Sequence, residues 1–196
     1  CLARLDQTGS LAGNLRLGPD LRCHPLAKGL FGTRIGPGQT ILLDAGTTTA
    51  LFARELAKLS CLTVITNSLD IATTLQAAGK DVLLLGGRMA ADVPATFGEL
   101  TLSEIRRFRV DLCFSAPVAV HPATGAFFYD LQEAEIAIAM AAQALQSVIL
   151  ADHSKLGKTS RVQSWEVGEI GRLVTNHAAD EEQLAAFRQA GVDVVA

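Results

Sequence analysis

The chain has 196 residues, of which 49% are hydrophobic, enough for one domain with a sizeable core or for two small ones. Its net charge of -3 argues against this piece holding a nucleic-acid backbone by itself, because that affinity comes from clustered lysine and arginine. No apolar run reaches the ~18–20 residues that a membrane-spanning helix needs, and no signal peptide is visible. We therefore expect a cytoplasmic protein without a membrane partner.

Residues 1–30 are irregular, with glycine, proline and asparagine scattered through them, and we interpret them as a linker or peripheral segment. The regular pattern begins after them and predicts one domain over residues 31–196. Because the chain starts with cysteine and not methionine, we expect a fragment or a processed form.

The first half of this domain alternates short apolar runs with helical patterns. Such strand–helix–strand units give parallel sheets with right-handed connections. The runs lack polar alternation, as expected for strands covered on both faces. The sequence thus predicts an α/β fold with an open, mainly parallel sheet and helices on both faces. The expected strands are 41–43, 62–65 and 82–85, and the expected helices are 48–59 and 69–78.

The second half continues the pattern after a loop at 89–96 and has a turn at 121–125. Alanine-rich residues 131–146 predict a long helix, and Asp180 is expected to cap the last one. The other expected elements are helices at 99–108 and 180–190, strands at 110–114, 147–151, 173–175 and 192–195, and a loop at 152–158.

The stretch 41–49 carries the strongest functional signal, reading Ile-Leu-Leu-Asp-Ala-Gly-Thr-Thr-Thr. A strand, a tight turn and a helix start in that order make an anion site, because the first-turn N–H groups lack intrahelical partners. Threonine hydroxyls add donors, and glycine lets a phosphate approach the backbone. An ordinary threonine-capped helix explains the same residues, and short motifs alone do not separate the two readings.

Polar residues or glycines also follow several other predicted strands. In an open parallel sheet these strand ends share one edge, where ligands bind. We expect a phosphate on the turn after the first strand, a cation from Lys155, and hydroxyl-binding groups from Asn67, Ser68 and the two aspartates. The candidate ligand-binding residues are Asp44, Gly46, Thr47, Thr48, Thr49, Asn67, Ser68, Gly86, Gly87, Asp152 and Lys155.

Each of these later residues also has a plain structural interpretation. Asn67 or Ser68 could only cap the next helix, Gly86 and Gly87 could form a simple turn, and Lys155 could be a solvated surface lysine. The four cysteines and four histidines show no metal-ligand spacing, so we expect no metal and no cofactor.

Five blocks in a fixed order make the chain similar to a known family. They are Leu-Asp-Ala-Gly-Thr-Thr-Thr (43–49), Val-Ile-Thr-Asn-Ser-Leu (64–69), Leu-Leu-Gly-Gly (84–87), Val-Asp-Leu-Cys-Phe (110–114) and Leu-Ala-Asp-His-Ser-Lys-Leu-Gly (150–157). From about Phe31 to Ala196 the chain resembles the C-terminal sensor domain of DeoR-family bacterial transcriptional regulators.

The resemblance implies a fold like that of ribose-5-phosphate isomerase, glucosamine-6-phosphate deaminase and CoA-transferases. It also implies a phosphorylated sugar or related metabolite as effector, assembly as a homodimer or homotetramer, and contact with operator DNA only through a separate N-terminal winged helix-turn-helix. Of the eleven candidate ligand-binding residues, the resemblance assigns ten to ligand positions of the family, and Asp152 is the one that it leaves out.

The chain departs from the family pattern in three places. The helix-turn-helix is absent, Ala137 stands where the family often has lysine, and Ser115-Ala116-Pro117 replaces a glycine-containing turn. We expect a binding module, the effector domain of a repressor of sugar metabolism, with no catalytic residues. The alternatives are a sugar-phosphate isomerase or deaminase, and an oligomerisation scaffold with a vestigial pocket.

Overall fold

The computed structural model describes residues 35–59, 61–91 and 93–196, so the expected segment 1–30 lies outside the described residues. The main sheet has seven strands in the order β12-β11-β9-β6-β1-β2-β3, and every neighbouring pair is parallel. The predicted open parallel sheet is thereby confirmed. Its strands are β1 (Thr40–Leu43), β2 (Thr63–Thr66), β3 (Asp81–Leu84), β6 (Val110–Ser115), β9 (Ala144–Leu150), β11 (Arg172–Val174) and β12 (Asp193–Val195).

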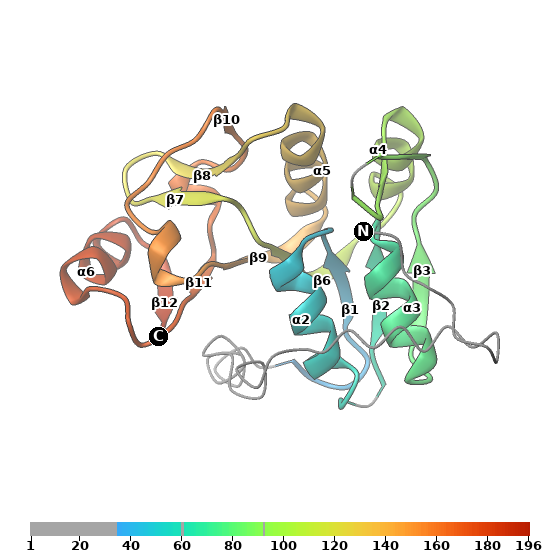
Figure 1. Ribbon diagram of the computed structural model, residues 1–196. Coiled ribbons are helices and arrows are strands. Elements are labelled where there is room, and N and C mark those ends of the chain that lie inside the picture. The colour runs from blue at the N-terminus through green and yellow to red at the C-terminus, as the bar shows by residue number, and fades with distance from the viewer. Residues whose placement is uncertain (1–34, 60, 92) are drawn as a thin grey trace, which may run out of the picture.

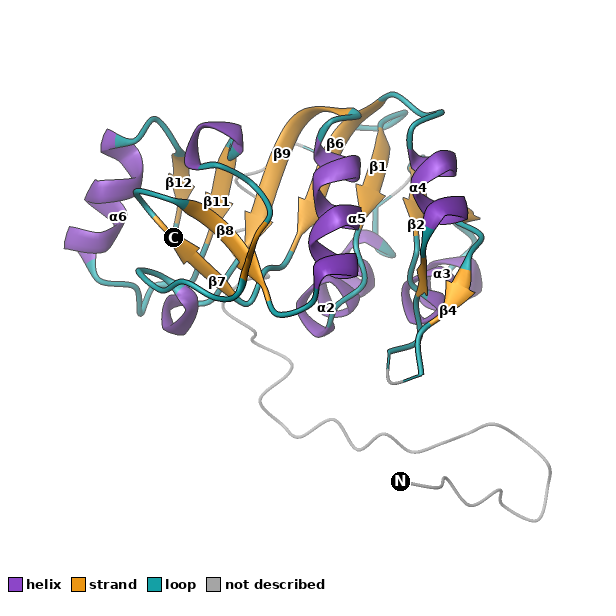
Figure 2. Cartoon of the chain, turned by 90° about the horizontal axis from the view of Figure 1, so that it is seen from above, coloured by secondary structure: helices purple, strands orange, loops and turns teal. Residues whose placement is uncertain are grey.

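Helices cover both faces of this sheet (Figures 1 and 2). In Figure 1, α4 and α5 lie above the sheet and α2 and α3 below it, and α6 packs near β12. None of the described helices is long and apolar enough to cross a membrane. The helices are α2 (Thr47–Leu56), α3 (Leu69–Ala77), α4 (Glu99–Ile105), α5 (Leu131–Ala141) and α6 (Glu181–Gln189), with the short 3₁₀ turns η3 (His153–Lys155) and η4 (Val167–Glu169).

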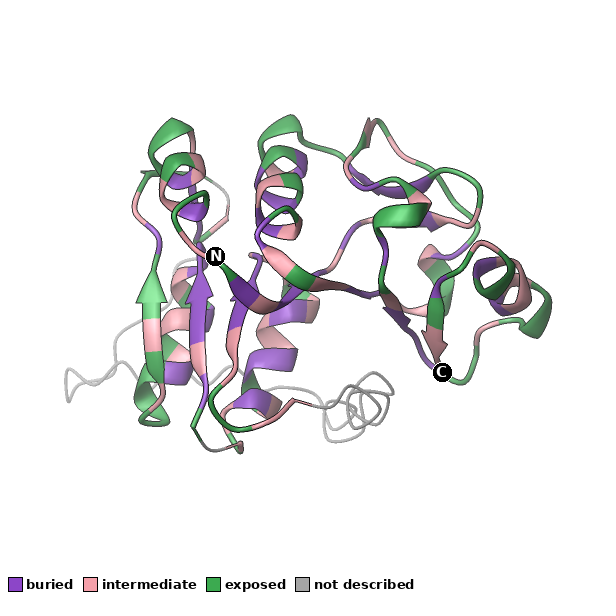
Figure 3. Cartoon of the chain, turned by 180° about the vertical axis from the view of Figure 1, so that it is seen from behind, coloured by how far each residue is buried: buried purple, intermediate pink, exposed green. Residues whose placement is uncertain are grey.

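Successive side chains of each central strand enter two separate cores. In β1, Leu42 packs with the cluster on the α5 side, whereas Ile41 and Leu43 pack with the cluster under α2 and α3. All three are fully buried, and each such side chain stabilises the fold by roughly 1.5–3 kcal/mol. Figure 3 shows β1 mostly buried, whereas the edge strand β3 is mostly exposed.

Two small sheets were not expected from the sequence: one replaces the ends of the expected loop at 89–96, and the other flanks the expected turn at 121–125, which is confirmed at residues 122–124. β4 (Arg88–Met89) pairs with β5 (Thr96–Phe97) inside the expected loop, and β7 (Ala119–His121) pairs with β8 (Gly125–Phe128) around the expected turn. A further strand, β10 (Val162–Gln163), adds to β8. Runs of two to four residues carry too little pattern to be recognised, because tertiary contacts decide whether they pair.

The predicted helix 131–146 is too long by five residues. α5 ends at Ala141, and β9 already begins at Ala144. The sequence from Ala144 to Gln146 favours a helix, but it pairs with β6, and Val110 N donates to Gln143 O at 3.0 Å. Pairing inside a buried sheet therefore outweighs the local helix preference.

Candidate functional site

The strand order reverses between β1 and β6. From β1 the chain builds β2 and β3 on one side, and β6, β9, β11 and β12 follow on the other. In open parallel sheets the crevice beyond the carboxyl ends of the strands at such a switch point is the usual ligand site. The turn after β1 holds Asp44 and Gly46, and the loop after β6 begins at Ala116, so these two loops flank the crevice.

The N-terminus of α2 lies in this crevice and lacks a side-chain cap. Gly46 is the N-cap residue and has no side chain to accept from the first N–H groups, and the first turn has no acidic residue. The first bond back to the cap runs from Ala50 N to Gly46 O at 2.9 Å, and Thr49 Oγ1 donates to the same carbonyl at 3.0 Å. The N–H groups of Thr47, Thr48 and Thr49 therefore precede the helical hydrogen-bond ladder and carry partial positive charge.

Asp44 is a buried carboxylate at the end of β1, with only 4% of its surface exposed. Its Oδ2 accepts from Ser115 Oγ and from Ala116 N, the latter at 3.3 Å, whereas its Oδ1 has no partner within the described part of the chain. Burial, helped by the negative charge of Glu133, raises its pKa from 3.8 to about 7, although the hydrogen bonds from Ser115 and Ala116 act in the opposite direction. Asp44 can therefore gain or lose a proton near neutral pH.

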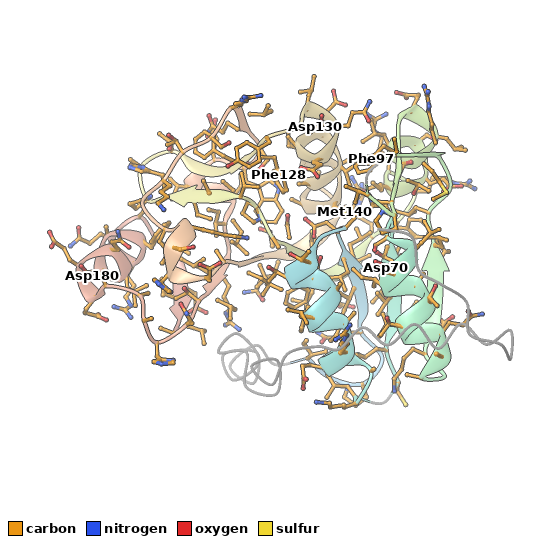
Figure 4. The ribbon with its side chains drawn as sticks, in the orientation of Figure 1. Asp70, Phe97, Phe128, Asp130, Met140 and Asp180 are labelled. Carbon is orange, nitrogen blue, oxygen red and sulfur yellow. The ribbon has the colours of Figure 1, made fainter. Side chains whose placement is uncertain are left out.

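Asn67 follows β2 and is 1% exposed. Its Nδ2 donates to Thr96 O at 3.0 Å, and its Oδ1 also has no hydrogen-bond partner within residues 35–59, 61–91 and 93–196. Asn67 and Asp44 share a recess of about 10 Å³, close to the smallest volume that holds a single water. The recess is lined by Asp44, Ala45, Asn67, Phe97, Phe128, Glu133 and Ile136, and Figure 4 labels Phe97 and Phe128 near α5.

Lys155 reaches the same crevice from η3. Its Nζ donates to Pro117 O at 3.0 Å, in the loop whose Ser115 and Ala116 bind Asp44. The loop 115–117 thus connects the predicted cation to the predicted carboxylate. Asp152 caps η3 by accepting from Ser154 N at 2.8 Å. Although partial burial would raise the pKa of Asp152, its hydrogen bonds with Ser154 and the charges of Lys155 and His153 lower it.

Gly86 and Gly87 pack against α4. Gly86 N donates to Glu104 Oε2 at 2.6 Å, and Gly86 O accepts from Thr101 Oγ1 at 2.7 Å. Gly87 has φ +148°, and a Cβ there would lie 2.1 Å from Thr101 Oγ1 and 2.9 Å from Phe97 O. Contacts with Thr101 and Phe97 therefore explain Gly87, and neither glycine lines the recess described above.

Ser68 is the N-cap residue of α3, and its Oγ accepts from Ile71 N at 3.4 Å. We expect Ser68→Ala to lower the free energy of unfolding by about 1 kcal/mol, the typical value of a lost cap, without changing ligand binding. Urea denaturation of the variant measures this, with the exposed Ser103→Ala as the control. A loss of ligand affinity without a loss of stability would assign Ser68 to the ligand instead.

Glu133 is the recess residue that the sequence pattern did not single out. Acidic residues are common in the first turn of a helix, and Glu133 lies in the first turn of α5. The tertiary structure brings its carboxylate to the recess that α5 shares with Asp44 after β1 and Asn67 after β2. Ser115 likewise donates a hydrogen bond to Asp44 because β6 pairs with β1, which places the two residues side by side.

Fold and site together define a parallel α/β domain with a polar recess at its switch point. Residues 30–177 match the DeoR C terminal sensor domain, so the chain belongs to this family. It is 30% identical over 167 residues to the HTH-type transcriptional repressor GlcR of Bacillus subtilis, covering 85% of this chain and 64% of that protein. It is 26% identical over 144 residues to the glycerol-3-phosphate regulon repressor of Escherichia coli, and this match covers 73% of this chain and 57% of that protein.

The chain thus spans about three fifths of the length of these relatives. Among solved structures, eIF2B beta of Chaetomium thermophilum superimposes with a TM-score of 0.56 at 16% identity, over 85% of this chain and 52% of that chain. At this identity the likeness concerns the fold alone. The membership expected from the five sequence blocks is confirmed.

Proposed function

We propose that the chain is the effector-binding domain of a transcriptional repressor of sugar metabolism, and that it senses a phosphorylated sugar or a related metabolite. Its family membership supports this, since the relatives are named as repressors and one is named for a glycerol-3-phosphate regulon. Operator DNA would be bound by a helix-turn-helix part of such a regulator, outside residues 35–196.

One observation carries the ligand class: at the switch point of the sheet, a helix start whose N-cap is a glycine lies beside two buried polar groups, each with an oxygen that no described residue satisfies. The N–H groups of Thr47, Thr48 and Thr49 would hold the phosphate. Lys155 would add a positive charge from the far side of the loop 115–117. Asp44 and Asn67 would bind the rest of the ligand, whereas Ser68, Gly86, Gly87 and Asp152 support the surrounding backbone.

The regulatory step follows from differential affinity. The recess admits about one water, so the body of a sugar phosphate would lie over its rim, between the loops that follow β1, β2 and β6. A ligand that binds one arrangement of these loops more tightly shifts the population toward it by that difference in affinity. We also propose that the protein assembles as a homodimer or homotetramer and works in the cytoplasm.

An isomerase or deaminase is the second candidate. A carboxylate whose pKa is about 7, next to an anion site, has the properties of a general base, and Asp44 meets that description. Because the relatives are transcriptional regulators, we favour binding without turnover. Conversion of ribose 5-phosphate or glucosamine 6-phosphate by the purified protein would support the enzyme instead.

A thermal-shift screen tests the proposed function. At 100 times its Kd a phosphorylated sugar adds about 2.7 kcal/mol of stability, which raises the Tm of a protein of this size by about 5–10 °C. The same sugars without phosphate are expected to shift it far less. Lys155→Ala and Thr48→Val are expected to reduce the shift, and equal shifts from both sugar forms would contradict a phosphate-centred site.

A further inference from the structure

The recess beside Asp44 presents acceptors and almost no donors. Asp44 Oδ1 and Asn67 Oδ1 are unpartnered among the described residues, and the carboxylate of Glu133 lines the same space. The amide Nδ2 of Asn67 is already bonded to Thr96 O. The other lining side chains are alanine, phenylalanine and isoleucine. A ligand group that enters the recess must therefore donate hydrogen bonds, because buried acceptors left unpaired are costly.

The size of the recess narrows the choice of donor. About 10 Å³ admits one group of the size of a water molecule. A hydroxyl group fits but has a single hydrogen, so it leaves one of the two unpartnered oxygens unsatisfied while Asp44 is ionised. A primary ammonium group is of similar size and has three donors, enough for both unpartnered oxygens.

The charge of the recess favours the same group. Two carboxylates line it, and Asp44 is almost fully buried, a situation that normally calls for a paired cation. None of the described lining residues is a lysine or arginine, and Lys155 is bonded to Pro117 O outside the recess. Within the described part of the chain, no lining side chain supplies the positive charge that would pair with Asp44.

We propose that the recess binds a primary ammonium group, so that the effector is a phosphate ester that also carries an amine. This rests on the proposed phosphate site at the start of α2. The phosphate takes the N–H groups of Thr47–Thr49, and the ammonium donates to Asp44 and Asn67, close to the negative charge of Glu133. Asp44 lies only three residues before Thr47, so one small molecule spans both subsites.

The pH dependence of binding distinguishes an amine from a hydroxyl. The groups that face Asp44 are Glu133 from α5, the buried Cys113 thiol of β6, and neutral Ser115 and Thr49. An ammonium group needs Asp44 ionised, so its affinity rises about tenfold from pH 6 to pH 8 as the proton leaves a group of pKa about 7. A hydroxyl group pairs with protonated Asp44, whose O–H then donates to it, so over this range its affinity falls relative to that of the matched amine, whose phosphate loses its second proton at about pH 6 as well.

Isothermal titration calorimetry with matched ligands tests the proposal. O-phosphoethanolamine is compared with 2-hydroxyethyl phosphate, and glucosamine 6-phosphate with glucose 6-phosphate, at pH 6 and pH 8, with inorganic phosphate as the probe of the anion site alone. We expect the amine of each pair to bind at least tenfold more tightly at pH 8. Asp44→Asn should abolish this preference, and Glu133→Gln should reduce it, whereas the exposed Glu135→Gln on the same helix should leave it unchanged.

The outcomes separate this inference from the proposed function. Suppose that inorganic phosphate and the hydroxyl esters bind but the amines bind no more tightly than their hydroxyl partners, or that the amines keep their higher affinity in Asp44→Asn. Either result would show that the ammonium site is wrong, while the phosphate site stands. If no phosphate compound binds, the phosphate site fails and the ammonium site fails with it.

Discussion

Replacement of Thr47 by glutamate is expected to weaken the binding of a phosphate ester by tenfold to a hundredfold, roughly, while the ligand-free protein becomes more stable. Thr47 is exposed and begins α2, so a carboxylate there should fit without clashes. It would interact favourably with the helix dipole, adding about 0.3–1 kcal/mol to the free energy of unfolding. The same charge, about 4 Å from a phosphate, repels it by roughly 1–4 kcal/mol per unit of phosphate charge.

The opposite signs of the two effects make this a strict test. Thermal denaturation gives the stability, and calorimetric titration with glucose 6-phosphate and glucosamine 6-phosphate gives the affinity. Thr47→Gln keeps the size of the side chain without its charge and should leave both quantities near those of the unchanged protein. Unaltered affinity in Thr47→Glu would place the phosphate away from the start of α2.

The stability of the ligand-free protein is expected to fall by about 2–3 kcal/mol between pH 5 and pH 8 because of Asp44. Its folded-state pKa of about 7 is raised above the ordinary value of 3.8, so the folded protein holds this proton more tightly than the unfolded chain does. The stabilisation is fully present below about pH 4, is lost as pH rises toward 7, and changes no further above that. Asp44→Asn cannot lose the proton and should lack this part of the pH dependence.

Urea denaturation at intervals from pH 5 to pH 8 measures the difference between the two proteins. Taking the difference removes the groups that titrate equally in both. Ser115→Ala serves as a second variant, since Ser115 donates to Asp44 and this bond lowers the pKa of Asp44. In Ser115→Ala this hydrogen bond is lost and the pKa of Asp44 rises further, so the free energy of unfolding should go on falling to a higher pH than in the unchanged protein. Parallel stability curves for Asp44→Asn and the unchanged protein would show that Asp44 is not held in a buried, unpartnered state.

The sequence predicted the main sheet well because its signals are local. Apolar runs such as 41–43 and 62–65 correspond to β1 and β2, and the turn that follows β1 does lead into a helix at Thr47. Asp180 caps α6 as expected, accepting from Glu182 N at 2.9 Å. Strand length, helix periodicity and capping depend on neighbouring residues, so they can be recognised without the tertiary structure.

The parts that could not be predicted depend on residues distant in the chain. Glu133 of α5 and Asp44 after β1 line one recess although they are far apart in the chain, and Asn67 turns its amide toward Thr96 because β5 lies beside that loop. A Cβ on Gly87 would lie 2.1 Å from Thr101 Oγ1 of α4, a contact that the sequence pattern does not reveal. A sequence pattern gives the type of residue at a strand end but not which neighbour will occupy its hydrogen bonds.

The central claim is that the exposed N–H groups at the start of α2 bind the phosphate of an effector. Amide chemical shifts of the ¹⁵N-labelled protein, followed during titration with inorganic phosphate and then with glucosamine 6-phosphate, test it most directly. We expect Thr47, Thr48 and Thr49 to shift with both, and the Asn67 side-chain amide to shift only with the second. Saturable shifts elsewhere, with these three amides unmoved, would contradict the claim.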